Sequence, residues 1–202
     1  NIGMAKIGLE MGEKSLYDAL IKWRLPEKCT AGGFGGGSHG ILCATHRWSD
    51  ISITRIPVGY ECAFSLLQIM RAYTAFFNEG RIVEPHVLAS ETVSRSVPVL
   101  KPETARWIRA ALTKGMTGDS AQESEVEEVP LFGMPAVVQK VLPRGMGYSP
   151  DRFHTSFVGG IETDETPYLI AVWLDEPERE DFFNPAPGMF RQCAELMLRY
   201  GE

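Results

Sequence analysis

The order of apolar periodicities along the chain constrains the fold more than any other feature of the sequence. Segments with helical spacing come first, three segments of strand-like composition follow, and an amphipathic helix ends the chain. The three strands are expected at residues 136–141, 155–161 and 168–174. A short acidic turn around Asp164 joins the last two, which favours antiparallel pairing. This order predicts an α+β fold with an antiparallel sheet of three strands packed with helices.

One helix carries clear signals at both ends. Ser65 and Gln68 have the spacing of a capping box at the start of a helix over residues 65–78, and Gly80 suits the C′ position after it. Its buried face is expected to consist of Leu66, Leu67, Met70, Tyr73 and Phe77. Other helices are expected at residues 4–11, 16–23, 102–114 and 187–200, an extended segment at 82–87 and a polar loop at 115–128. The last helix is expected to pack one face of the sheet with Phe190, Cys193 and Met197.

Composition and charge exclude several classes of protein. The chain has 202 residues, of which 44% are hydrophobic and 23% charged, values typical of a single globular domain rather than a disordered chain. A formal net charge of −6 argues against a nucleic-acid partner. No apolar run reaches the length of a membrane-spanning helix, and no signal peptide is visible. Because the chain opens with Asn1 rather than Met, a fragment or a processed chain is expected.

The cysteines and histidines give no pattern of a metal centre or a cofactor site. The four cysteines lack C-x-x-C spacing and are expected to be free thiols, while a bridge between Cys29 and Cys43 remains an open alternative. No H-x-H or H-E-x-x-H arrangement occurs among His39, His46, His86 and His154. We therefore expect no metal and no cofactor.

The glycine-rich segment around Ser38 matches two short motifs by letter alone. Residues 36–40 read G-x-S-x-G, the nucleophile elbow of α/β-hydrolases, and residues 35–40 also fit G-x-G-x-x-G. Both motifs require a strand before the loop and a helix after it. Glycine-rich coil precedes Ser38 and Ile41-Leu42 follows it, so a serine hydrolase using Ser38 is kept only as a remote alternative.

Several segments in order resemble the transpeptidase domain of class B penicillin-binding proteins, which synthesise peptidoglycan cross-links during bacterial elongation or division. The opening Asn1-Ile2-Gly3-Met4 is similar to the family's S-x-N-I-G-M segment, cut so that only its Asn remains. Ser65-Leu66-Leu67-Gln68 stands where T-P-L-Q is usual. Further similar segments follow in family order: Gln139-Lys140-Val141, Ser156-Phe157-Val158-Gly159 and Asp175-Glu176-Pro177. The resemblance covers nearly the whole chain.

The resemblance implies three catalytic motifs, of which this chain retains little. No serine in the chain is followed three residues later by lysine, so the S-x-x-K nucleophile motif is absent. Asn1 is the remnant of S-x-N, and Met134-Pro135-Ala136 stands where K-T-G belongs. Met134 removes the cation that would hold a substrate carboxylate, and Pro135 removes a hydroxyl and a backbone donor. The N–H of Val137 is still suitable for an oxyanion hole.

These departures leave two main interpretations of residues 1–202 as the C-terminal portion of one transpeptidase-like domain, with the upstream strands and the S-x-x-K helix missing. One is a fragment of a peptidoglycan D,D-transpeptidase, and the other is a non-catalytic pseudoenzyme that binds cell-wall or division proteins. No catalytic residue is expected in this chain, and binding of peptidoglycan stem peptides or β-lactams is expected to be weak. The resemblance implies the extracytoplasmic face of the bacterial cytoplasmic membrane, reached through a missing N-terminal anchor. Uncovered apolar faces predict poor solubility for the chain expressed alone.

Overall fold

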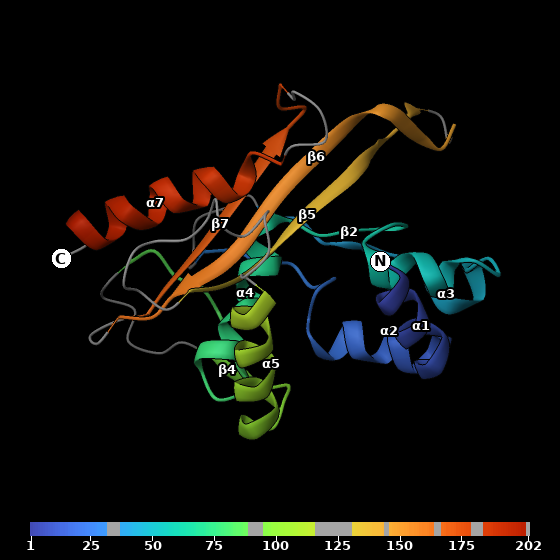
Figure 1. Cartoon of the computed structure of the whole chain (residues 1–202). Helices are drawn as coiled ribbons and strands as arrows, with labels where there is room; N and C mark the ends of the chain where they lie inside the picture. The colour runs from blue at the N-terminus through green and yellow to red at the C-terminus, as the bar shows by residue number, and fades with distance from the viewer. Residues whose placement is uncertain are drawn as a thin grey trace. The chain divides into compact units, whose positions relative to one another are not determined.

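The computed structural model describes residues 1–31, 37–88, 95–115, 131–143, 146–163, 167–178 and 184–200. The chain divides into two compact units, Asn1–Lys101 and Pro102–Glu202 (Figure 1). Each unit combines helices with antiparallel strands, so the predicted α+β class is confirmed. The predicted acidic turn around Asp164 and nearly all of the polar loop at 115–128 lie outside the described residues.

The first unit opens with two helices, α1 (Ile2–Met11) and α2 (Glu13–Lys22). Gly12 separates them with a φ of 76°, a left-handed conformation that glycine adopts without steric cost. A small core of Leu16, Ile53 and Ile56 lies beneath them. The short elements that follow have no clear period in the sequence: β1 (Ile41–Leu42), η1 (Thr45–Arg47), α3 (Ser52–Arg55), η2 (Ile56–Val58) and β2 (Cys62–Ala63), with β1 and β2 paired antiparallel.

Helix α4 (Leu66–Phe77) confirms the predicted capping box. The Ser65 hydroxyl accepts a hydrogen bond from the Gln68 backbone N–H at 3.2 Å, and the Gln68 side chain accepts one from the Ser65 N–H at 2.7 Å. The left-handed turn after the helix begins one residue before the predicted position, because Glu79 (φ 49°) precedes Gly80 (φ 80°). The chain then enters β3 (Arg81–Val83), shorter than the extended segment predicted at 82–87, which pairs antiparallel with β4 (Ser96–Pro98).

The prediction for the buried face of α4 was wrong. The fully buried residues of this helix are Gln68, Arg71, Ala72 and Ala75, whereas the predicted apolar residues Leu66, Leu67, Met70, Tyr73 and Phe77 are only partly buried. The two alanines permit close packing, and Ala75 joins Ile82 and Val99 in a second small core. Gln68 and Arg71 face backbone carbonyl groups of distant loops, which require hydrogen-bond donors rather than apolar contacts.

The second unit contains the predicted antiparallel sheet, in the order β5-β6-β7, so β5 is an edge strand among the described residues. The strands are longer than predicted: β5 is Leu131–Val141, β6 is Tyr148–Ile161 and β7 is Tyr168–Asp175. The extension of β5 through Gly133 was missed because glycine and proline normally end a strand. Gly133 lies against the Phe157 ring, where an added Cβ would meet two ring atoms at 2.5 Å.

Helices α5 (Pro102–Gly115) and α7 (Ala186–Tyr200) flank this sheet. Helix α5 contacts β5, and α7 lies along β6 and β7 (Figure 1). The predicted packing of α7 is correct for Phe190, which is fully buried, but wrong for Met197, which is 38% exposed, while Cys193 is half-buried. The contacting stripe is instead Ala186, Phe190, Ala194 and Leu198, because residues four apart lie on one side of a helix.

Candidate substrate-binding strand

The segment predicted to replace K-T-G lies in the middle of the edge strand β5. Met134, Pro135 and Ala136 stand opposite Val158, Phe157 and Ser156 of β6. A strand edge offers backbone N–H and C=O groups to a ligand in extended conformation. The structure therefore places the predicted substrate-binding residues where an added strand would find backbone partners.

Alternation of side chains along β5 assigns these residues to opposite faces of the sheet. Leu131 belongs to the core cluster that contains Phe157 and the α7 residue Phe190, so odd-numbered positions of this strand face α7. Met134 and Ala136 consequently point to the other face. Met134 is 53% exposed there, so a lysine at this position would have its cation in an open location.

The position of Pro135 fixes the direction of the backbone groups around it. Proline has no N–H, so within a sheet it is tolerated where that group would face away from the neighbouring strand. Peptide groups of alternate residues in an antiparallel pair point the same way. Val137 is therefore expected to direct its N–H and C=O to the open edge of β5. This direction is the one that the predicted oxyanion-hole role of Val137 requires.

Lys140 is the only charged residue in β5, and its charge is already paired. Its ammonium group lies 2.6 Å from a carboxylate oxygen of Asp175 and also contacts Glu176. Hydrogen bonding to Asp175, then to Glu176, raises the pKa of Lys140, and the contact with Lys140 lowers the pKa of Asp175. His154 joins the group, with Nδ1 3.1 Å from Asp175 and its ring tilted against that of Trp173, the ring centroids 4.8 Å apart. The Lys140 ammonium group is therefore paired with Asp175 and Glu176 and is not available to a ligand carboxylate.

Asn1, the predicted S-x-N remnant, is the N-cap residue of α1 in the first unit. Its exposed side chain makes no capping hydrogen bond to the helix. The side-chain amide of Asn1 therefore makes no capping hydrogen bond with α1. That Asn1 and β5 face one cleft stays a prediction.

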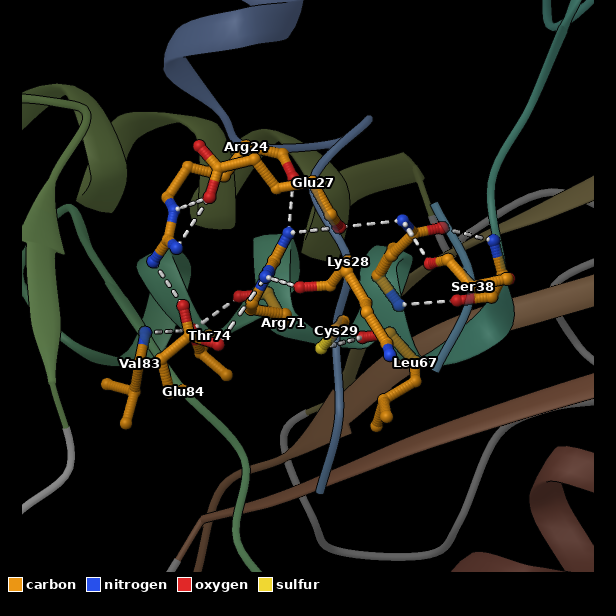
Figure 2. A network of polar contacts seen from close by, with 12 residues as sticks. Arg24, Glu27, Lys28, Cys29, Ser38, Leu67, Arg71, Thr74, Val83 and Glu84 are labelled. Atoms are coloured by element: carbon orange, nitrogen blue, oxygen red, sulfur yellow. Dashed lines mark hydrogen bonds and ion pairs between the residues drawn. The ribbon is translucent and has the colours of Figure 1, made fainter. Parts of the chain in front are cut away.

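A buried polar network surrounds α4 in the first unit (Figure 2). The Gln68 amide donates to the backbone carbonyls of Glu27 (2.8 Å) and Ser38 (3.3 Å). One turn further on, the fully buried Arg71 guanidinium donates to the carbonyls of Arg24, Glu27 (3.3 Å) and Lys28 (3.4 Å). The Gln68 and Arg71 side chains therefore hold residues 24–28, which precede the glycine-rich loop, against α4.

Glu84 and Glu27 supply negative charge to this network. Glu84 pairs with Arg71 at 3.4 Å and also with Arg24 (Figure 2). A hydrogen bond from Arg24 lowers the pKa of Glu27, which keeps that carboxylate ionised beside the cations. Sequence reasoning missed the network. The available signal was a glutamine and an arginine three residues apart inside a mostly apolar helix, which places both on one face.

Ser38 does not have the surroundings of a hydrolase nucleophile on the side of the loop that is described. Its side chain is exposed, and its carbonyl is held by Gln68. Residues 39–44 contain no helix after it, only the two-residue strand β1. Residues 32–36 before it lie outside the described part of the chain. The interpretation of the G-x-S-x-G match as coincidental agrees with this local structure.

The four cysteines are free thiols, as predicted, and the alternative Cys29–Cys43 bridge is not formed. Cys29 is buried and its Sγ lies 3.9 Å from the Leu67 carbonyl oxygen. Burial raises the pKa of Cys29, and burial raises the pKa of Cys62 to about 11. Both thiols are therefore protonated, and poor nucleophiles, near neutral pH.

The described residues form neither a metal cluster nor a membrane-spanning helix. Those residues contain no group of three or more histidine, cysteine, aspartate or glutamate side chains that could hold a metal ion. None of the helices in the same ranges is long and apolar enough to cross a bilayer.

Comparison with known proteins shows what the chain is similar to. Residues 1–193 match the family described as the penicillin binding protein transpeptidase domain. The penicillin-binding protein PbpB of Mycolicibacterium smegmatis is 26% identical over 98% of this chain and 34% of its own length. The probable peptidoglycan D,D-transpeptidase PbpC of Pseudomonas aeruginosa is 27% identical over 91% of this chain and 32% of its own length. The chain thus spans about a third of the length of these relatives.

Solved structures show the same fold. Penicillin-binding protein 3 of Mycobacterium tuberculosis, complexed with aztreonam, superposes with a TM-score of 0.86 at 24% identity, covering 98% of this chain and 49% of that protein. The unliganded transpeptidase domain of penicillin-binding protein 3 from Burkholderia pseudomallei gives a TM-score of 0.84 at 24% identity, covering 98% of this chain and 60% of that domain. The family resemblance and the partial transpeptidase fold predicted from the sequence are both confirmed.

Proposed function

Because the chain belongs to the penicillin-binding protein transpeptidase domain family, we propose that it is part of a peptidoglycan D,D-transpeptidase-like protein of bacterial cell-wall synthesis whose catalysis is impaired. The observation that supports impaired catalysis is the composition of the edge strand β5. Its Met134-Pro135-Ala136 segment, which stands where K-T-G is expected, offers no cation and no hydroxyl to a substrate carboxylate.

The remaining charge on β5 does not compensate for this loss. Lys140 lies beyond the substituted segment and is paired with Asp175 and Glu176. A charge-assisted hydrogen bond contributes about 1.5–3 kcal/mol. Losing both the lysine and the hydroxyl contacts therefore predicts acylation about a hundredfold slower, or worse, than with an intact motif. The nucleophile is a separate requirement, because this chain has no S-x-x-K and an upstream one would have to supply it.

The test uses the longest form of the protein, with any upstream S-x-x-K intact. It is labelled with a fluorescent penicillin, and the labelling is repeated with Met134→Lys, Pro135→Thr and Ala136→Gly combined. The proposal expects slow or absent labelling of the native protein and faster labelling of the triple variant. Ser38→Ala serves as the matched control, and its labelling should equal that of the native protein. Rapid native labelling that the triple change does not increase would show that catalysis is not impaired.

A second candidate is a pseudoenzyme scaffold that binds cell-wall or division proteins. It is favoured by the contrast between a fold kept over 98% of the chain and the uncharged segment in β5. Genetic complementation distinguishes the impaired enzyme from the scaffold. A depletion strain rescued by the native protein, and rescued equally well after the upstream serine is replaced, supports the scaffold, whereas rescue that requires the serine supports an enzyme.

We also propose that the domain works at the extracytoplasmic face of the cytoplasmic membrane, held by an N-terminal anchor outside this chain. The proposal rests on the match to the transpeptidase family, whose substrate is peptidoglycan. Protease digestion of spheroplasts is the appropriate measurement. Degradation of the domain in intact spheroplasts is expected, and protection until lysis would contradict the proposed location.

A further inference from the structure

The open edge of β5 retains most of the backbone groups that a ligand strand needs. Pro135, Val137 and Gln139 alternate along the strand, and their pairing with β6 stays regular up to Gln139. Because Pro135 is tolerated only with its nitrogen outward, all three direct their peptide groups to the open edge. The edge therefore presents three carbonyl acceptors but only the N–H donors of Val137 and Gln139. It is richer in acceptors than an ordinary strand edge.

The side chains that flank this edge are apolar. Met134 is 53% exposed on the face opposite α7, and Ala136 is exposed beside it. Val137 is 40% exposed on the α7 face. A strand added to β5 would place its alternate side chains against these groups, and cross-strand apolar pairs stabilise such an arrangement.

The electrostatics of the edge disfavour an anionic ligand. Lys140 holds its carboxylate partners Asp175 and Glu176, and neighbouring Arg152 lies 3.8 Å from Glu176. A ligand carboxylate placed beside Met134 would lose water without gaining a cation from β5. It would also meet outward carbonyl oxygens, which are acceptors like itself. An amide at the same place would instead donate hydrogen bonds to them.

From these observations we propose that the edge of β5 from Pro135 to Gln139 binds an extended apolar peptide segment that has an amide, not a carboxylate, next to Met134, by adding it to the sheet as a further strand. The inference deepens the proposed function and rests on it for the location of the site. The proposed ligand differs from a carboxylate-bearing peptide, which an intact K-T-G would bind.

The experiment uses the longest form of the protein, as in the labelling test, and pentapeptides in which threonine alternates with valine, leucine or phenylalanine, each with a fluorescent label on its N-terminal nitrogen. Every peptide is made with a C-terminal amide and with a free carboxylate, and binding is followed by fluorescence anisotropy. At least one amide peptide is expected to bind about tenfold or more tightly than its carboxylate form. Met134→Lys is expected to reverse that preference, because it adds a cation beside the ligand end.

Two further arms test strand addition itself. Methylating the peptide nitrogens that would face β5 should weaken binding at least about fivefold, whereas methylating the alternate nitrogens should have little effect. Val137→Pro, which removes an outward donor, should weaken binding of the unmethylated peptide, and Val137→Thr is its matched control. The methylation arm changes only the ligand, so it remains decisive if the proline variant does not fold.

The remaining outcomes contradict the proposal. These are failure of every amide peptide to bind, equal or tighter binding of the carboxylate forms, equal effects of the two methylation patterns, and a dimer of the chain that buries this edge and excludes the peptides. None of them depends on penicillin labelling. A protein that acylates normally would overturn the proposed impairment without deciding peptide binding, and the reverse also holds.

Discussion

Helix α4 and strand β5 differ in the polar side chains that they carry. In α4, a guanidinium with no exposed surface is retained and surrounded by three backbone carbonyls and the Glu84 carboxylate. In β5, the positions expected to hold a lysine and a threonine carry Met134 and Pro135, and the edge is left open. A buried charge is costly even when most of its donors are paired, so the retention of Arg71 in α4 indicates a role in holding loops together.

The side chains that hold the fold in α4 are separate from those that the proposed function assigns to ligand recognition in β5. The network around Arg71 depends on contacts within the fold, and its removal would affect the stability of the first unit. The substitutions in β5 occupy exposed or half-buried positions, where changes are tolerated with little effect on folding. The proposed loss of K-T-G chemistry in β5 is therefore compatible with the transpeptidase fold.

The largest effect is expected from removing the buried cation. Arg71→Leu removes the side-chain donor to the Arg24 and Lys28 carbonyls and one of the two cations beside Glu84, so the free energy of unfolding should fall by about 3 kcal/mol or more. The measurement is the midpoint of urea unfolding with its slope checked for constancy. Lys140→Leu, which removes the exposed pair on β5, is the comparison variant and should change the midpoint far less. Equal decreases of the unfolding midpoint in Arg71→Leu and Lys140→Leu would contradict the difference between α4 and β5.

A smaller effect is expected at the start of α4. Ser65→Ala removes the hydroxyl that accepts the Gln68 backbone N–H, and loss of such a cap costs about 1 kcal/mol. Gln68 also anchors the Ser38 carbonyl, so hydrogen exchange at residues 37–40 should quicken along with that of the first helical turn. Ser38→Ala, which removes an exposed hydroxyl, provides the control. An unchanged melting temperature in Ser65→Ala would mean that the capping box does not stabilise the helix.

The smallest effect concerns the Lys140–Asp175 pair and its dependence on pH. The folded-state pKa of Asp175 is lowered, so its contribution is present above the unfolded value of about 3.9 and is lost as pH falls through the lower folded value. The pKa of Lys140 is raised, so its contribution is present below about pH 10.4 and is lost as pH rises through the higher folded value. Between these limits the contribution should be constant.

The measurement is the difference in melting temperature between the native chain and Asp175→Asn across pH. The variant should be slightly less stable at pH 7, with a difference that shrinks in acid below about pH 4. Glu195→Gln, which breaks the exposed Arg191–Glu195 pair on α7, is the matched control for a helix-surface ion pair. A difference that grows as the solution becomes more acidic would contradict the assigned pairing.

The sequence by itself determined the features that depend on neighbouring residues. The capping box at Ser65 was predictable because both partners lie within one helical turn, and the three antiparallel strands were recognisable from their composition. The position of Met134 and its neighbours in β5 followed from the order of family-like segments. Their exposure and the outward direction of the Val137 peptide group required the sheet order and the pairing register.

Tertiary structure decided which side of each element is buried. On α4 it selected Gln68 and Arg71 over the apolar stripe, because carbonyls from a segment more than 40 residues earlier need donors at that surface. On α7 it selected Ala194 over Met197, because the stripe that meets β6 and β7 follows the position of Phe190. Local hydrogen bonds are set by spacing along the chain, whereas burial depends on which distant groups arrive at the same surface.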